Sequence, residues 1–420
     1  MLRDLNRAAR GAATCLCLAV AAGCGGSSDG HGSGNRPPPP PAGPPPPATW
    51  SVGPAACIDG LAGDFPCAGI DLRKRVPLAA MGGSAGNDLW GWADPATGRE
   101  YALVGMNNGT AFLDVTDPAA PVYLGRLPTR TFSSTWRDIK VYRNHAYIVA
   151  DDAGAHGMQV FDLTRLRGLT GPQNFGPDRM YLEFANAHNI AINEDTGFAY
   201  AVGTNRCGGG LHMIDIRTPN NPMFAGCHGP SYTHDTQCVI YRGPDAQFAG
   251  REICFSANET HFAIVDVTVK SSPVTLAEID YPQRGYVHQG WLTEDHRYFF
   301  LGDEFDELQF GVPTRTHVFD VAELTAPQYL YPYEAGTRAS THNLYVLGNR
   351  VLQANYTAGL QVLEFGDLAA AELNEVAFFD TYPANDTTVF QGAWTVYPYL
   401  PSGTLLVNDI QNGLFILAPR

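Results

Sequence analysis

The chain has 420 residues, of which 45% are hydrophobic and 16% are charged, and its formal net charge is −15. This composition is typical of a folded protein, and the length is sufficient for one large repeat architecture or two ordinary domains. The negative charge argues against nucleic acid as a partner, because no basic stripe is available to neutralise phosphates.

The first 23 residues have the pattern of a lipoprotein signal peptide. Three arginines precede an apolar run, residues 12–22, that is too short to span a bilayer. The run ends in AAGC, which resembles a bacterial lipobox with Cys24 as the lipidated residue; an ordinary secretory signal cut nearby is the alternative. We therefore expect an exported lipoprotein of the bacterial envelope, anchored in a membrane and facing the periplasm or the cell surface.

Residues 24–50 follow as a Gly/Ser-rich stretch with runs of five and four prolines. Such a segment is expected to be a solvated, semi-rigid spacer rather than a folded domain. It would hold the folded part, residues 51–420, away from the membrane.

Six cysteines lie beyond this spacer, and an even number in an exported protein indicates three disulfides. Proximity along the chain favours one set among the 15 pairings. These pairs are Cys57–Cys67, Cys207–Cys227 and Cys238–Cys254.

From about residue 82, short β-runs joined by turn signals recur with a period of roughly fifty residues. Their third strands align as GTAFLDV, GMQVFDL, GLHMIDI, HFAIVDV, RTHVFDV, GLQVLEF and GLFILAP. Five of them carry an aspartate at the same place, where its side chain is expected to cap the following turn. These residues are Asp114, Asp162, Asp215, Asp266 and Asp320.

Seven such units predict an all-β fold, a seven-bladed β-propeller. The last unit lacks an outer strand of its own, whereas the early run IDLRKRVPLAAM, residues 70–81, resembles the outer strands of other units. We expect this N-terminal strand to pair with the last one and to close the ring, which removes exposed sheet edges.

Several stretches resemble the choice-of-anchor B family of bacterial exported proteins, among them WRDIKVYRNHAYIVAD, YTHDTQCVIYRGPD and YVHQGWLTEDHRYFFLGDE. The third strands are similar to LVIVD-type repeats, which are associated with propellers. The resemblance covers roughly residues 57 to 420. It implies a propeller fold and an envelope location, and it implies no particular activity.

A polar pair opens the innermost strand of six units. The pairs are Asn87-Asp88, Arg137-Asp138, His188-Asn189, His234-Asp235, His288-Gln289 and His342-Asn343, and Phe390-Gln391 is the nearest equivalent in the seventh unit. Equivalent positions of a propeller form a ring at one height, so the four histidines are expected at one channel mouth. Imidazole is a common ligand of Zn, Cu and Fe, which makes one transition-metal ion the candidate cofactor.

Two interpretations of the histidine ring remain open. Each of His188, His234, His288 and His342 could hydrogen-bond a neighbouring blade and tighten the ring, or three of them could bind a metal ion together with water. In the metal interpretation, Asp88 and Arg137 face the cluster, while Asp138 and Asp235 orient the imidazoles.

Two further groups have a structural and a functional interpretation. Asp303, Glu304, Asp306 and Glu307 could hold Ca²⁺, but a solvated loop is the preferred interpretation. Trp90, Trp136, Trp291 and Trp394 lie near innermost strands, where packing is preferred over stacking on a sugar.

Two functions are consistent with these features. The sequence favours a monomeric, non-catalytic propeller that binds a protein, glycan or other surface partner. The alternative is a periplasmic metal-dependent enzyme, such as an oxidoreductase, that uses the axial histidines.

Overall fold

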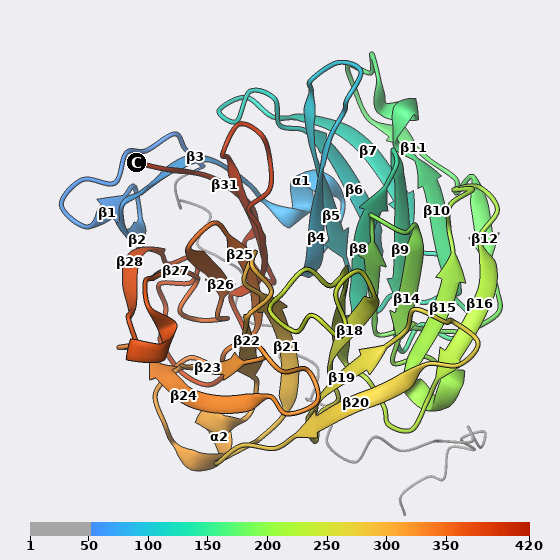
Figure 1. Ribbon diagram of the computed structural model, residues 1–420. Helices are drawn as coiled ribbons and strands as arrows, with labels where there is room; N and C mark the ends of the chain where they lie inside the picture. Colours follow the sequence, from blue (N-terminus) through green and yellow to red (C-terminus); the bar gives the residue numbers. More distant parts are fainter. Residues whose placement is uncertain (1–51) are drawn as a thin grey trace, which may run out of the picture. The chain divides into compact units, whose positions relative to one another are not determined.

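Antiparallel sheets make up the part of the chain that the computed structural model describes, residues 52–420. Seven sheets stand around a common axis, and each contributes its first strand to the centre (Figure 1). The predicted all-β, seven-bladed propeller is therefore confirmed. Among the described residues, no helix is long and apolar enough to cross a bilayer.

The first three blades hold residues 86–228. Blade 1 consists of β4 (Gly86–Ala93), β5 (Glu100–Met106), β6 (Gly109–Asp114) and β7 (Val122–Pro128), and β11 (Gln173–Asn174) adds to it in parallel. Blade 2 consists of β8 (Arg137–Tyr142), β9 (His145–Ala150), β10 (Met158–Asp162) and β12 (Arg179–Tyr181). Blade 3 consists of β13 (Asn189–Asn193), β14 (Phe198–Val202), β15 (Leu211–Asp215) and β16 (Met223–His228).

The next two blades hold residues 235–334. Blade 4 consists of β17 (Asp235–Ile240), β18 (Glu252–Ala257), β19 (Phe262–Asp266) and β20 (Val274–Ile279). Blade 5 consists of β21 (Val287–Leu292), β22 (Tyr298–Asp303), β23 (Arg315–Asp320) and β24 (Gln328–Glu334).

The last two blades combine both ends of the described chain. Blade 6 consists of β25 (Asn343–Leu347), β26 (Arg350–Ala354), β27 (Leu360–Phe365) and β28 (Leu373–Phe379), extended by β2 (Phe65–Ala68) and β1 (Leu61–Ala62). Blade 7 consists of β29 (Ala393–Tyr397), β30 (Leu405–Asp409), β31 (Gly413–Pro419) and β3 (Ile70–Val76). The α-helices are short: α1 (Leu78–Met81) and α2 (Asp306–Phe310).

The innermost strands contact one another in the order β4, β8, β13, β17, β21, β25 and β29, and β29 returns to β4. They run in the same direction along the axis, because the residues at the starts of neighbouring strands contact one another. Residues at equivalent positions of these strands therefore lie at the same height in the central channel.

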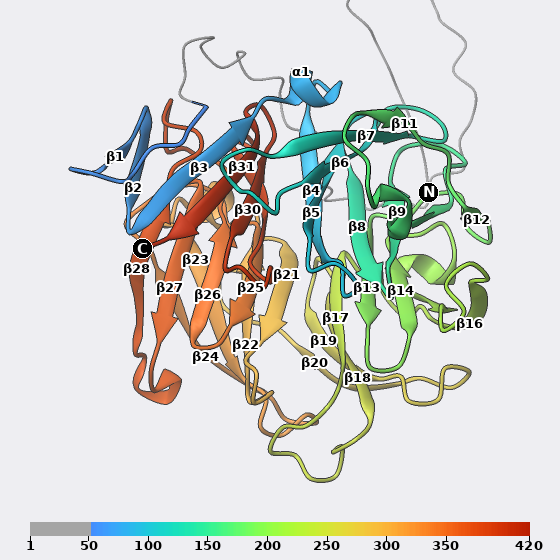
Figure 2. The ribbon, with the colours of Figure 1, turned by 90° about the horizontal axis from the view of Figure 1, so that it is seen from above.

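The strand β3 lies on the outside of blade 7 and pairs antiparallel with β31, from Ile70 opposite Pro419 to Val76 opposite Leu414 (Figure 2). Its Leu72 is fully buried in the apolar cluster that blades 6 and 7 share. The N-terminal part of the described chain thus supplies the fourth strand of the last sheet.

The aspartates that end five of the third strands cap the turns that follow, as predicted. In each case Oδ1 accepts a hydrogen bond from the backbone N–H two residues later, at 2.9–3.0 Å. These bonds satisfy a donor that the strand ladder leaves free. The aspartates therefore have a structural role.

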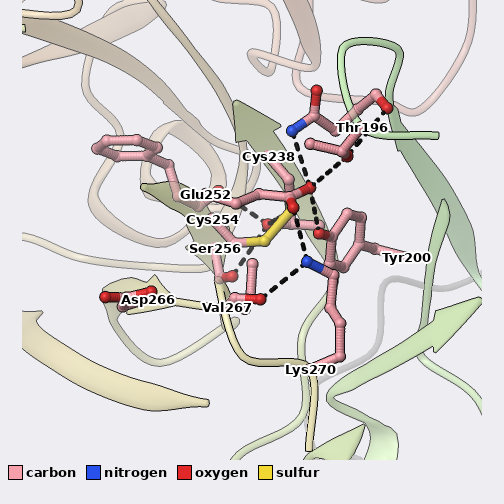
Figure 3. Close-up of a disulfide and its surroundings, with 12 residues drawn as sticks. Thr196, Tyr200, Cys238, Glu252, Cys254, Ser256, Asp266, Val267 and Lys270 are labelled. Carbon is pink, nitrogen blue, oxygen red and sulfur yellow. Dashed lines mark hydrogen bonds and ion pairs between the residues drawn. A yellow bond between two sulfur atoms is a disulfide. The ribbon is translucent and has the colours of Figure 1, made fainter. Parts of the chain in front are cut away.

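The three predicted disulfides are confirmed: Cys57–Cys67, Cys207–Cys227 and Cys238–Cys254. Cys238 lies directly opposite Cys254 on β17 and β18, with their Cα atoms 4.0 Å apart. Figure 3 shows this bridge beside a buried carboxylate, Glu252.

Glu252 of blade 4 joins its own blade to blade 3. Its Oε1 accepts hydrogen bonds from Tyr200 Oη at 2.6 Å and from Thr196 Oγ1 at 2.8 Å (Figure 3). Its Oε2 lies 2.6 Å from Lys270 Nζ, which also donates to the carbonyl of Val267. A charge buried with these partners is satisfied, and it fixes how the two blades meet.

Candidate functional site

The four predicted histidines lie side by side at the start of the innermost strands. His188, His234 and His342 directly precede β13, β17 and β25, and His288 occupies a bulge near the start of β21. The ring centroids of successive histidines are 4.3, 4.2 and 4.4 Å apart. All four side chains are buried, so blades 3 to 6 bring the imidazoles together in one layer.

Hydrogen bonds fix the orientation of three imidazoles. His188 Nδ1 lies 2.9 Å from a carboxylate oxygen of Asp151, and His234 Nδ1 lies 2.9 Å from the carbonyl oxygen of His288. His342 Nδ1 lies 2.5 Å from the carbonyl oxygen of Trp394. Because these oxygens accept hydrogen bonds, each Nδ1 carries the proton. In a neutral imidazole this leaves Nε2 unprotonated, which is the usual state of a metal-ligating histidine.

A carboxyl group from the neighbouring strand joins the histidine layer. Glu304 follows β22, and its two oxygens lie 3.9 Å from His288 Nε2 and 3.9 Å from His342 Nε2. Tyr356 Oη donates a hydrogen bond to Glu304 Oε1 at 2.5 Å. One ligand atom from each of His288, His342 and Glu304 lies within 4.8 Å of the other two. Two imidazoles and one carboxylate are a common donor set for zinc and for non-haem iron.

Burial determines the protonation of this cluster. It raises the pKa of Glu304 to about 8, against an ordinary value of 4.5. It lowers the pKa of His342 to about 3, and it lowers that of His288 well below 6.5, where the neighbouring imidazoles add to the effect. At neutral pH these two imidazoles are therefore uncharged, which is the form that binds metal ions.

The acidic stretch 303–307 is not a solvated loop, so that prediction is wrong. Asp303, Glu304, Asp306 and Glu307 are all buried. Asp303 accepts hydrogen bonds from Tyr281 Oη and from the backbone N–H of Gly285, Tyr286, Phe305 and Asp306, which identifies it as a structural anchor. Glu304 alone of the four approaches the axial histidines.

The predicted role of Asp138 as an orienting group is also wrong. Its Oδ2 accepts a hydrogen bond from the N–H of Ile190 at 2.6 Å, and its Oδ1 lies 2.6 Å from Lys140 Nζ. Asp88 makes the corresponding bond to Ile139 and also contacts Lys140. These aspartates therefore join neighbouring blades, and a carboxylate outside the polar pairs, Asp151, orients an imidazole instead.

The other two predicted polar residues also have partners outside the histidine layer. Arg137 donates to the carbonyl oxygen of Met106 at 3.1 Å and lies 3.3 Å from His156 Nε2. Asp235 accepts a hydrogen bond from the N–H of Thr236 and lines a cavity further along the channel.

The innermost strand of blade 7 begins later in the chain than the sequence suggests. Its innermost strand begins at Ala393, so Trp394 rather than Phe390-Gln391 occupies the position of the histidines. The register was misplaced because a bulge at Trp394 interrupts the pairing of β29 with β30. The Trp394 ring lies 4.9 Å from that of His342. With Trp136, Tyr286, Phe305, Tyr356 and Phe390 it forms an aromatic cluster beside the histidines.

Glu304, Tyr356 and Asp151 were not predicted to lie beside the histidines, although Glu304 was named in the acidic stretch. A signal for Glu304 and Asp151 was present, because both directly follow the second strand of a blade. That strand runs antiparallel to the first, so its end lies beside the residue that opens the first strand. The position after each second strand was therefore a candidate for the same layer.

No family model matches the sequence, and no curated protein matches it either. Among solved structures, the β-propeller domain of Cps50 (Swd1) from Myceliophteria thermophila is similar, with 11% identity, a TM-score of 0.52 and coverage of 80% of this chain and 98% of that one. A chain of a Mitotic Checkpoint Complex has 13% identity, a TM-score of 0.51 and coverage of 79% and 90%. The periplasmic gluconolactonase PpgL of Pseudomonas aeruginosa has 12% identity, a TM-score of 0.50 and coverage of 70% and 88%. These likenesses establish the fold alone.

Proposed function

We propose that the chain is a metal-dependent enzyme of the bacterial envelope, with one transition-metal ion held on the propeller axis by His288, His342 and Glu304. The observation that carries this proposal is the convergence of His288, His342 and Glu304, whose ligand atoms lie within 4.8 Å of one another, with His342 Nδ1 already engaged by the carbonyl oxygen of Trp394. The uncharged imidazoles of His288 and His342 and the buried carboxyl of Glu304 stabilise one another little, since their atoms lie 3.9 Å apart. A cation among them would be stabilised by the lone pairs and by the ionised Glu304.

The residues support a catalytic site better than a purely structural one. Structural zinc sites are closed by four protein ligands, whereas two imidazoles and a carboxylate leave positions open for water or substrate. Zn, Cu or Fe would supply Lewis-acid or redox chemistry there. The protein would hold the ligands: the Trp394 carbonyl fixes His342, and the Tyr356 hydroxyl holds Glu304.

A non-catalytic propeller that binds a protein or glycan partner is the competing function. It would need the histidines only to tighten the ring, and the hydrogen bonds of His234 and His342 to neighbouring blades do serve that purpose. It gives no reason for Glu304 to be buried beside two imidazoles with an Oε2 atom that has no hydrogen-bond partner among the described residues. Propellers of both kinds are among the similar structures, since one is named as a gluconolactonase and another as a checkpoint complex.

The metal site is tested by stripping the purified protein with a chelator and titrating it with Zn²⁺, Cu²⁺ and anaerobic Fe²⁺. We expect one tightly bound ion per chain. A variant with His288→Ala and His342→Ala should lose that ion, and Glu304→Gln should lower the affinity for the ion at least tenfold. The measurements are calorimetry and elemental analysis after desalting.

The matched control replaces two histidines outside the layer, His145→Ala and His261→Ala, and should retain the ion. Circular dichroism verifies that each variant remains folded. Absence of a stoichiometric ion in the parent protein, or its retention in the variant lacking His288 and His342, would refute the proposed site.

The envelope location is part of the same proposal, and Cys24 lies outside the described residues. Three disulfides support an oxidising compartment. Replacing Cys24 with Ser is expected to release the protein from the membrane fraction or to leave the signal uncleaved. Cys17→Ser, a change within the apolar run, serves as the control and should not alter fractionation. Unchanged membrane association of the Cys24 variant would count against lipid anchoring.

A further inference from the structure

A cavity of about 420 Å³ lies on the propeller axis at the opposite ends of the innermost strands from the histidines. Each innermost strand advances by roughly 3.3 Å per residue, so Tyr345, three residues after His342, lies about 10 Å further along the axis. Blades 1 to 6 each contribute the residue two positions after their polar pair, and blade 7 contributes Tyr397, which follows Trp394 by three residues as Tyr345 follows His342. These residues are Trp90, Lys140, Ala191, Gln237, Trp291, Tyr345 and Tyr397.

Four of these seven residues are aromatic, and they form a continuous wall. The ring of Tyr345 lies 4.9 Å from that of Trp291 and 5.9 Å from that of Trp90, and Trp90 lies 4.9 Å from Tyr397. The wall thus extends over blades 5, 6, 7 and 1, while Ala191 of blade 3 leaves space opposite. Aromatic faces of this kind attract cations through their quadrupoles.

The protein already places a cation of its own against this wall. Lys140 Nζ lies 4.6 Å from the centroid of the Trp90 ring. The same ammonium group contacts Asp138 at 2.6 Å and Asp88 at 3.3 Å, so its charge is compensated beneath the cavity. Lys140 therefore adds little positive charge to the open space.

Carboxyl groups outnumber ammonium groups among the described residues that line the cavity. Glu194, Asp235 and Glu294 line it together with Lys140. Burial, followed by the charge of Asp138, raises the pKa of Asp235 to about 7. An incoming cation would favour the ionised form of Asp235, and the carboxylate would in turn attract the cation.

From the aromatic wall and the excess of carboxyl groups we infer that this cavity binds a small organic cation, an amine or a quaternary ammonium compound, against Trp291, Tyr345 and Tyr397 with Asp235 as counter-ion. The volume lies within the range of small-molecule sites, roughly 300–1,000 Å³. An anion would face three carboxyl groups, whereas a neutral sugar could form hydrogen bonds to them but would gain no charge attraction. The inference does not depend on a metal ion at the other end of the channel.

The test compares choline with 3,3-dimethylbutan-1-ol, which has nearly the same shape and no charge. Calorimetry on the purified protein is expected to show choline binding at least tenfold tighter than the alcohol. Asp235→Asn, which keeps the size of the side chain, should weaken choline binding about tenfold. Trp291→Leu should weaken it as well, because it removes one aromatic face.

The control variant is Glu364→Gln, which removes an exposed carboxylate on β27 far along the blade and should leave choline binding unchanged. Equal affinity for choline and the alcohol would overturn the inference, as would choline binding that Asp235→Asn leaves unaffected. Binding of maltose without binding of choline would also overturn it and would assign the cavity to a sugar. If Asp235→Asn does not fold, the comparison of the two ligands and the Trp291 variant still decide the outcome.

Discussion

Replacing Leu72 with Asp is expected to unfold the whole propeller, with a loss of roughly 5 kcal/mol or more. Leu72 is fully buried at the centre of β3, where it packs in the same cluster as Phe415 and Leu417. An aspartate there would remove the apolar contacts and bury an unpaired charge. Because β3 completes blade 7, the damage would extend to the strand that links the last blade to the first.

Denaturant unfolding followed by tryptophan fluorescence measures this loss. The expected result is one transition at a much lower denaturant concentration, or failure to obtain folded protein. Ala79→Asp introduces the same side chain at an exposed position of α1 and should change stability by less than about 1 kcal/mol. An unchanged midpoint for Leu72→Asp, or a small early transition followed by the normal one, would contradict closure through β3.

Much of the fold could be predicted because the same pattern of short strands and turns recurs in seven units. The aspartates that end five third strands are visible in the sequence, and each makes the turn bond expected of it. The disulfides followed from proximity, since Cys238 and Cys254 belong to adjacent strands. The start of the innermost strand of blade 7 was predicted too early in the chain, because a bulge at Trp394 interrupts the repeat pattern at that position.

The candidate site was only half predictable. The histidines share one phase of the repeat, and the structure places them in one layer. Glu304 belongs to no such series, and its neighbours Asp303 and Asp306 made it look like part of a solvated acidic loop. Glu304 is buried because it follows β22 and contacts Tyr356 of the next blade. This contact joins segments that are distant in the sequence, and a local sequence pattern does not reveal it.

The pH dependence of stability in chelator-treated protein should report directly on Glu304. Its pKa is near 4.5 in an unfolded chain and about 8 in the folded one. Between these values the folded protein holds a proton that the unfolded chain has released, so the free energy of unfolding falls as pH rises. The contribution of Glu304 is fully present below pH 4.5 and is lost as pH rises through 8. His342, with its pKa lowered to about 3, has the opposite dependence, but its contribution is constant above its ordinary value of 6.5.

Between pH 6.5 and 8, the change in the free energy of unfolding therefore comes from the buried carboxyl groups and not from His342. One group whose folded pKa lies at the upper limit changes stability by about 1.4 kcal/mol per pH unit, or roughly 2 kcal/mol over the window. Glu304→Gln should remove the part of this loss of unfolding free energy that Glu304 causes. Asp306, whose pKa is also raised to about 8, continues to contribute in the parent protein and in the variant. Glu364→Gln, at an exposed ion pair, should leave the slope of the parent protein unchanged.

Added metal should oppose the decline, because binding displaces the proton from Glu304 and strengthens as pH rises. Identical slopes for the parent and Glu304→Gln would show that Glu304 is ionised without a metal ion, and the electrostatic argument for the axial site would then fail.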